Sequence, residues 1–223
     1  ATTLQRLTTI EVQSDALAGL RTFSPAIERA LEAVALAREL SLPDREASAH
    51  TSLGHMFRFS GSPDKALSHF TFAARCYTAA SMHTLAGQTY ITMASLSSED
   101  QASALMHLSS SLAAFSSEKP PTSSSLAGQY HAGRSLGFVQ KKMKKTSPLT
   151  AFEAALSALT HGLMATAPED AGRVPFEVGL LLETSSPERA KKCFKQAEAM
   201  YDREGKVSLS RMAAEKAQQC SAA

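Results

Sequence analysis

The sequence predicts an all-α protein, a right-handed solenoid of about five antiparallel helix pairs closed by one C-terminal helix. A sixteen-residue block, SPDKALSHFTFAARCY at 62–77, recurs 124 residues later as SPERAKKCFKQAEAMY at 186–201, with six identical positions. The 223 residues include only 11 glycines and 9 prolines and are 43% hydrophobic, which favours helices over a turn-rich β protein. Internal repetition is typical of solenoids, in which each unit buries its apolar face on its neighbours.

The repeated block has the spacing of a helix. Ala66, Phe70, Ala73 and Tyr77 follow one another at steps of 4, 3 and 4 residues, which places them on one stripe. Ser62-Pro63-Asp64 predicts the start of that helix, with a capping hydroxyl, a proline in the first turn and a carboxylate at the positive end of the dipole. Ser186 begins the second copy in the same way.

A helix with an internal glycine precedes the repeated helix. Gly54, Gly137 and Gly179 lie 7 to 10 residues before the next Ser-Pro pair, so the two helices are predicted to be antiparallel neighbours. A glycine inside a helix costs about 1 kcal/mol relative to alanine. Its recurrence therefore predicts a close crossing of the two helices.

Five units cover most of the chain. Ala30, Ala66 and Ala102 are 36 residues apart and predict the spacing of the first three units. The fourth unit has Ala155 where the block has its phenylalanine, and 206–219 is left as the closing helix.

The units are predicted to form a single domain, 1–223, with a loop near its middle. Ala102 and Ala151 are 49 residues apart, which indicates an insertion. The segment 116–125, SSEKPPTSSS, has the prolines and serines of a loop. It separates N-terminal repeats (1–115) from C-terminal repeats and the capping helix (126–223).

Composition argues against several classes of protein. With 23 basic and 21 acidic residues, no global field favours nucleic acid or an anionic membrane. The three cysteines form no CxxC pair, which fits a reducing compartment. Because no stretch approaches the roughly 18 apolar residues of a membrane span, we expect an intracellular protein, cytoplasmic or nuclear.

No catalytic, cofactor or metal site is predicted, so we do not expect an enzyme. The sequence contains no HExxH, GxSxG, P-loop or dinucleotide-binding motif. His50 and His55 are five residues apart on one helix and diverge by about 140°. We interpret the histidines and cysteines as packing residues.

The second unit resembles the tetratricopeptide repeat (TPR). The stretch 35–70 is similar to the long-helix repeats of kinesin light chains and spindle-orientation adaptors, and the more divergent units resemble the vesicle-fusion SNAP adaptors. The resemblance implies a non-catalytic scaffold or adaptor, a subunit of a larger assembly that holds partner proteins on its concave face and ends. The residues that carry it are Leu53, Gly54 and Phe57, the turn glycine Gly61, and Ala66, Phe70 and Ala73.

In that family the groove is lined by first-helix positions, which in the second unit are small and mostly uncharged and in the fourth and fifth are basic with apolar interruptions. An acidic amphipathic helix or an extended acidic peptide would require such a face. The candidate partner-binding residues are His55, Arg58 and Phe59 in the second unit, and His131, Arg134, Phe138, Lys141, Lys142, Arg173 and Phe176 in the fourth and fifth.

Alternatives stay open at this point. The run KKMKK at 141–145 also fits a solvated helix end. A SNAP-like or motor-cargo adaptor would engage helical bundles rather than a peptide, and a nucleic-acid-binding repeat would use the basic patch at 134–145. The N-terminal helix carries Leu4, Leu7, Ile10 and Leu17, so we expect this end to pack on a partner or on further sequence, and the chain to be unstable without it.

Overall fold

The computed structural model describes residues 2–144, 147–163 and 170–220. Within these ranges all regular structure is helical, which confirms the all-α prediction of five helix pairs followed by one closing helix. The chain forms two compact units, Ala1–Glu118 and Lys119–Ala223. Among the described helices, none is both long and apolar enough to cross a membrane.

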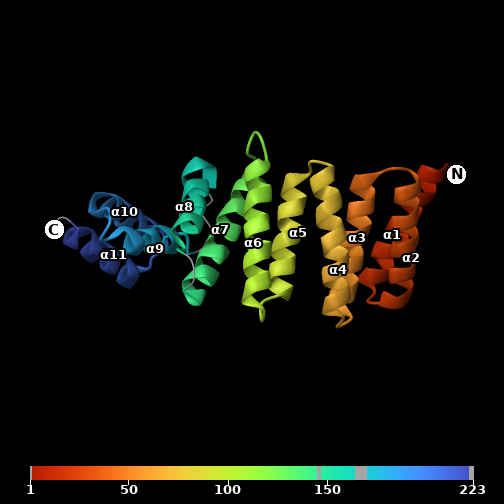
Figure 1. Cartoon of the computed structure of the whole chain (residues 1–223), viewed down its shortest axis with the longest axis horizontal. Helices are drawn as coiled ribbons and strands as arrows, with labels where there is room; N and C mark the ends of the chain where they lie inside the picture. The colour runs from red at the N-terminus through yellow and green to blue at the C-terminus, as the bar shows by residue number, and fades with distance from the viewer. Residues whose placement is uncertain (1, 145–146, 164–169, 221–223) are drawn as a thin grey trace. The chain divides into compact units, whose positions relative to one another are not determined.

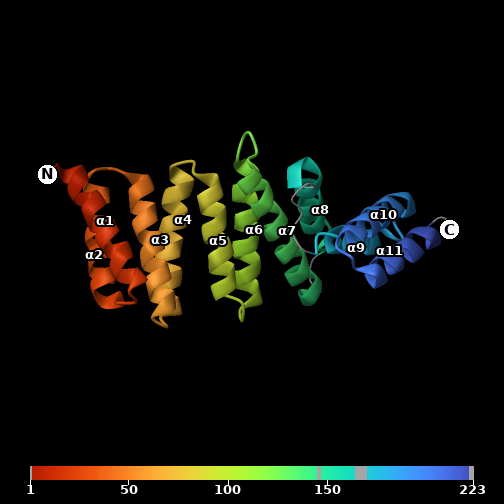
Figure 2. The same cartoon turned by 180° about the vertical axis from the view of Figure 1, so that it is seen from behind.

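Unit 1 consists of three antiparallel helix pairs that follow one another in sequence order (Figures 1 and 2). Within this unit, each helix packs on the unit's helices that are next to it in the chain. The helices are α1 (Thr3–Gly19), α2 (Phe23–Glu39), α3 (Pro43–Phe59), α4 (Pro63–Ala79), α5 (His83–Leu96) and α6 (Gln101–Ser117).

Unit 2 contains two helix pairs and the closing helix. α7 packs on α8, α9 packs on α10, and α10 also packs on the closing helix α11. The elements are α7 (Ser123–Met143), α8 (Leu149–Ala158), the π-helical turn η1 (Leu159–Leu163), α9 (Arg173–Leu182), α10 (Pro187–Arg203) and α11 (Val207–Gln219). Only residues 118–122 are non-helical between α6 and α7, so both helices extend into the predicted loop at 116–125.

The predicted serine caps are wrong in one respect. Pro63 and Pro187 do lie in the first turns of α4 and α10, but the hydroxyls of Ser62 and Ser186 make no capping hydrogen bond. Ser62 has ψ 71° and Ser186 has ψ 72°, outside the extended conformation that a capping residue typically adopts. The Ser62 N–H donates to the carbonyl of Phe57 at 2.8 Å, which ends α3, while the Ser62 carbonyl accepts from Ala66 at 3.0 Å, which begins α4.

The helix pairs of unit 1 repeat every 40 residues. α1, α3 and α5 begin at 3, 43 and 83, and the left-handed residues of the turns stand at 21, 41, 61 and 81. The predicted spacing of 36 is therefore wrong. A shift of four residues is about one helical turn, so an alanine stripe matches the neighbouring turn almost as well as the correct one.

A phenylalanine ring packed on a helical glycine joins the two helices in four of the five pairs. A Cβ atom added at any of these glycines would lie within 2.6 to 2.7 Å of a ring carbon, so only glycine fits. The glycine–phenylalanine contacts are Gly54 with Phe70, Gly87 with Phe115, Gly137 with Phe152, and Gly179 with Phe194.

In the fourth pair the ring belongs to Phe152. The expectation that Ala155 takes this place is wrong, because Phe152 already fills the notch above Gly137. Ala155 packs one turn away, where a Cβ added at Gly133 would approach its methyl group at 3.2 Å. The small residues therefore serve a second close approach between α7 and α8.

The first pair has no such contact. In the 40-residue register Ser14 stands in place of Gly54 and Ala30 in place of Phe70. The buried Ser14 hydroxyl donates instead to the carbonyl of Ala26 on α2 at 3.0 Å. A side-chain hydrogen bond thus replaces ring packing between α1 and α2.

Of the four apolar residues predicted to make the N-terminal helix need a partner, three lie in the core of unit 1. Leu7 and Ile10 are buried between α1 and α2, and Leu17 packs against the same core. Leu4 stays 52% exposed. Of the four residues, Leu4 alone stays exposed, but Val12 (63%) and Leu20 (75%) add exposed apolar surface to this helix and its C-cap.

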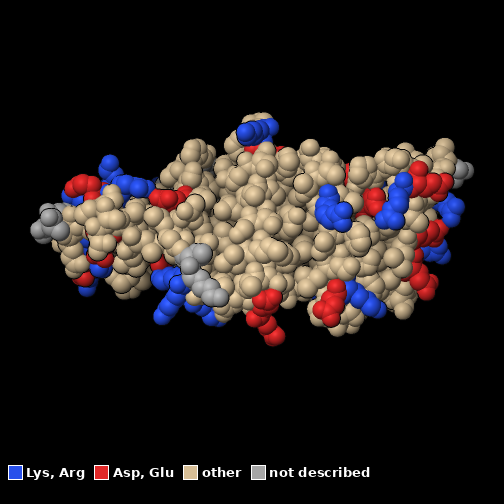
Figure 3. All heavy atoms as spheres, viewed as in Figure 1, with Lys and Arg blue, Asp and Glu red and all other residues tan. Residues whose placement is uncertain are grey.

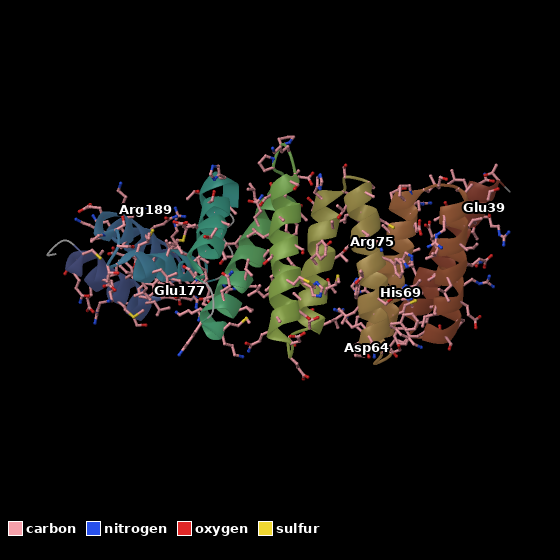
Figure 4. The ribbon with its side chains drawn as sticks, viewed as in Figure 1. Glu39, Asp64, His69, Arg75, Glu177 and Arg189 are labelled. Atoms are coloured by element: carbon pink, nitrogen blue, oxygen red, sulfur yellow. The ribbon has the colours of Figure 1, made fainter. Side chains whose placement is uncertain are left out.

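Two histidines form a buried pair inside unit 1. The Nδ1 atoms of His50 on α3 and His69 on α4 are 3.0 Å apart, so one ring donates and the other accepts. The His50 ring also stacks on Phe72, and the His69 ring on Phe57. Figure 4 labels His69 on α4.

The environment of the pair disfavours the charged form of His50. Burial and then the charge of His69 lower the pKa of His50 to about 4, while Glu46 opposes the shift and Arg38 adds to it. Burial also lowers the pKa of His69. The His50 Nε2 atom is buried without a hydrogen-bond partner among the described residues, so a second proton on this ring would find no acceptor.

Replacing Gly54 by alanine is expected to destabilise the protein by about 1–3 kcal/mol, because the new methyl group would overlap the Phe70 ring. Gly19→Ala is the control, since nothing lies within 4 Å of a Cβ added there. That change is expected to leave stability unchanged or to raise it by up to about 1 kcal/mol. Urea unfolding followed by circular dichroism measures both, and equal stabilities would contradict the packing described.

Acid is expected to destabilise unit 1 through His50. A histidine whose pKa is lowered by folding contributes stability that is complete above its unfolded pKa near 6.5 and declines as pH falls toward 4. The decline amounts to at most about 3 kcal/mol. Urea unfolding at pH 7, 5.5 and 4.5 should show a shallower loss for His50→Leu than for the parent chain. His161→Gln, which changes an exposed histidine of unit 2, should not alter the slope.

Candidate partner-binding surface

The structure brings seven of the ten predicted residues together on unit 2. His131, Arg134, Phe138 and Lys141 follow at steps of three and four along α7, so they share one stripe of the helix. We call the group the basic–aromatic surface. Its members are His131, Arg134, Phe138, Lys141 and Lys142 of α7, and Arg173 and Phe176 of α9.

Phe138 is the centre of this surface. The guanidinium carbon of Arg173 lies 4.4 Å from its ring centroid, and that of Arg134 lies 5.8 Å from the same point. Two cations from two helices thus approach one aromatic ring, which attracts each of them. Among the residues that the structure describes, neither arginine forms an ion pair.

The aromatic residues of the surface are held by the glycine–phenylalanine contacts. The Phe138 ring packs edge-on against Phe152, with centroids 5.1 Å apart. Phe176 packs in the same way against Phe194 at 5.5 Å. Because Phe152 and Phe194 fill glycine notches, the positions of both surface rings are set by the core.

Lys141 is partly neutralised by a residue that sequence reasoning missed. Its Nζ atom lies 2.5 Å from a carboxylate oxygen of Glu177 on α9, and Glu177 is only 7% exposed (Figure 4). Lys141 is predicted as a contact for an acidic partner, and in the structure its ion pair also links α7 to α9. The signal was the single acid in the apolar stretch 174–182.

Lys142 and Lys144 supply the remaining positive charge at the end of α7. Both are exposed, and blue atoms gather there in Figure 3. Lys144 ends the helix in the left-handed conformation with φ 54°. Lys145, the last lysine of the predicted run, lies outside the described residues.

A second charge network borders the surface, and the sequence did not predict it. Lys206 makes ion pairs with Asp170 and Glu204, and the hydrogen bond from Lys206 lowers the pKa of Asp170.

Two buried polar groups near this network have no hydrogen-bond partner among the described residues. One is the hydroxyl of Tyr130, whose pKa is raised by burial. The Nε atom of Arg134 is likewise buried without an acceptor among the described residues, so this N–H does not donate to the network.

His131 lies at the edge of the basic–aromatic surface. Its ring packs edge-on against Tyr130 at 5.2 Å. Partial burial and then the charge of Arg134 lower its pKa. His131 therefore adds a neutral hydrogen-bonding group at neutral pH rather than another cation.

The three predicted residues of unit 1 separate into two places. His55 packs edge-on against Phe70 at 5.0 Å and lines a pocket of about 180 Å³ between α3, α4 and α5. Arg58 lies over the ring of Phe59 at 4.8 Å, at the end of α3. Phe59 is 65% exposed and stacks on Phe23 of α2, with centroids 6.5 Å apart.

Within the described ranges, no three metal-ligating side chains come together. Cys76 is partly buried, and Cys193 and Cys220 are buried free thiols. Burial raises the pKa of Cys76 and of Cys193, which keeps both protonated at neutral pH.

No protein-family model and no curated protein matches the chain. Solved structures do match. The apo form of RapI has a TM-score of 0.56 at 13% identity, over 97% of this chain and 83% of that one. Aspartyl phosphate phosphatase F from Bacillus subtilis has a TM-score of 0.59 at 14% identity, over 99% of this chain and 61% of that one.

A third match is a variant of the TPR-like repeats of a putative kinesin light chain from Podosopora anserina. Its TM-score is 0.53 at 14% identity, over 90% of this chain and 97% of that one. At such identities the likeness concerns the fold. The chain is a TPR-like helical repeat protein by its fold, as the sequence predicted.

Proposed function

We propose that the chain is a non-catalytic protein-interaction module that binds an acidic segment of a partner protein on the basic–aromatic surface of unit 2. The observation that carries the proposal is the approach of Arg134 and Arg173 to the single ring of Phe138. Neither guanidinium group forms an ion pair with a described residue, and the ring beside them offers an apolar contact. A segment that alternates carboxylates with apolar residues would complement both.

The fold is compatible with this role. A Rap protein of similar fold was solved in complex with competence and sporulation factor, with a TM-score of 0.51 and 11% identity. In the present chain, the carboxylate of Glu177 partly offsets the charge of Lys141. Recognition is therefore expected to depend on Arg134, Arg173 and Lys142 rather than on the whole lysine run.

The binding test uses a fluorescein-labelled amphipathic peptide with glutamates on one helical face and leucines on the other. Anisotropy should show saturable binding, and a glutamine version of the peptide should bind at least about 10-fold more weakly. Arg134→Glu combined with Arg173→Glu should reduce affinity by a similar factor. Lys192→Glu with Lys195→Glu, two exposed lysines of α10, is the control with the same change of charge and should leave affinity nearly unchanged.

Equal binding by all variants would contradict the proposal. A single-stranded RNA of 20 nucleotides serves as a second probe. Tight RNA binding that weakens steeply between about 50 and 200 mM salt and is lost in the arginine variant would favour a nucleic-acid-binding repeat instead.

A further inference from the structure

Unit 1 carries two equivalent pockets, one helix pair apart. The first lies between α1, α2 and α3, and the second between α3, α4 and α5. Shifted by 40 residues, Glu11 and Asp15 of the first pocket correspond to Thr51 and His55 of the second. The second pocket is therefore an internal control for the first.

The first pocket is larger because it lacks a phenylalanine. Phe70 lines the second pocket, and its counterpart in the first is Ala30. The volume is accordingly about 290 Å³ against about 180 Å³. The space that a ring fills in one helix pair is thus open in the other, above a floor that includes the methyl groups of Ala30, Ala33 and Ala49.

The two pockets also differ in charge. Glu11 and Asp15 stand one turn apart on α1, whereas the second pocket has no carboxylate in its lining. Arg45 partly compensates the negative charge of the first pocket. Its Nη2 atom lies 3.1 Å from a carboxylate oxygen of Glu11 and donates a hydrogen bond to the Thr8 hydroxyl at 2.9 Å. Asp15 forms no ion pair with any described residue, so the lining keeps one uncompensated negative charge.

The direction in which the pKa of Glu11 is shifted agrees with a deficit of positive charge in the first pocket. Burial raises its pKa, Arg45 opposes the shift, and the carboxylates of Asp15 and Asp44 raise it further. The net direction is upward, so Arg45 alone does not stabilise the negative charge fully. An additional cation at this place would be attracted by all three carboxylates.

We propose that the first pocket of unit 1 binds the arginine or lysine side chain of a partner protein. The aliphatic stem would cover the alanine floor, and the cationic head would reach Asp15 and Glu11 at the rim. An acidic side chain would meet the unpaired Asp15, and a neutral one would leave its charge uncompensated. This site does not depend on the function proposed for unit 2.

The proposal can be tested on the full chain labelled at its alanine methyl groups. The probes are the acetylated pentapeptide amide Gly-Gly-Arg-Gly-Gly and its citrulline counterpart, which has nearly the same shape without the charge. The arginine peptide should shift the methyl signals of Ala30, Ala33 and Ala49 saturably, and the citrulline peptide should bind about 10-fold more weakly. Equal affinities of the two peptides would overturn the proposal.

Two variants locate the site. Ala30→Phe with Ser14→Gly rebuilds the contact found between Phe70 and Gly54, so it should fill the pocket and abolish the effect. Asp15→Asn, a change at the exposed rim, should weaken the arginine peptide about 2- to 5-fold. Asp64→Asn, which removes an exposed carboxylate of α4 (Figure 4), is the control and should leave the affinity for the arginine peptide unchanged. Unchanged binding to the filled variant or to Asp15→Asn would show that the cation binds elsewhere.

Discussion

The contact between a phenylalanine ring and a helical glycine is the interaction on which the rest of the structure depends. It brings the helices of four pairs so close that a single methyl group would not fit between them. Two of the candidate binding residues pack against the same rings. His55 and Phe138 directly follow the glycines Gly54 and Gly137, and each packs edge-on against the ring that covers its glycine. The core therefore sets the positions of the side chains that are offered to a partner.

The two units differ in how they use charge around this common core. In unit 2, two arginines share one aromatic ring, and neither has an ion-pair partner among the described residues. In unit 1, the pocket beside α1 has one carboxylate more than it has cations. A repeat protein can thus keep one packing rule and still present opposite charges in its separate units, because the charged residues do not themselves form the glycine–phenylalanine contacts.

The sequence was sufficient for the helices, their pairing and the role of the glycines, since all of these depend on local spacing. It was not sufficient for register. Ala30 aligns with Ala66 as well as with Phe70 by periodicity alone, because one turn more or less leaves a residue on the same stripe. The tie between Lys141 and Glu177 could not be predicted either, because the two residues are 36 positions apart and meet only through the packing of α7 beside α9. The candidate surface therefore stays a prediction, and the pairing of Lys141 with Glu177 lowers the positive charge that it presents.

The turn at Ser62 has a consequence for how such a chain can change in length. The same residue closes α3 through its N–H and opens α4 through its carbonyl, so the turn contains no spare residue. Inserting or deleting one residue there would rotate all of α4 by about 100° and take its alanine stripe away from α3. Loops elsewhere absorb such changes at little cost in free energy. At this turn the tolerated step of growth or loss is consequently a whole helix pair rather than a single residue.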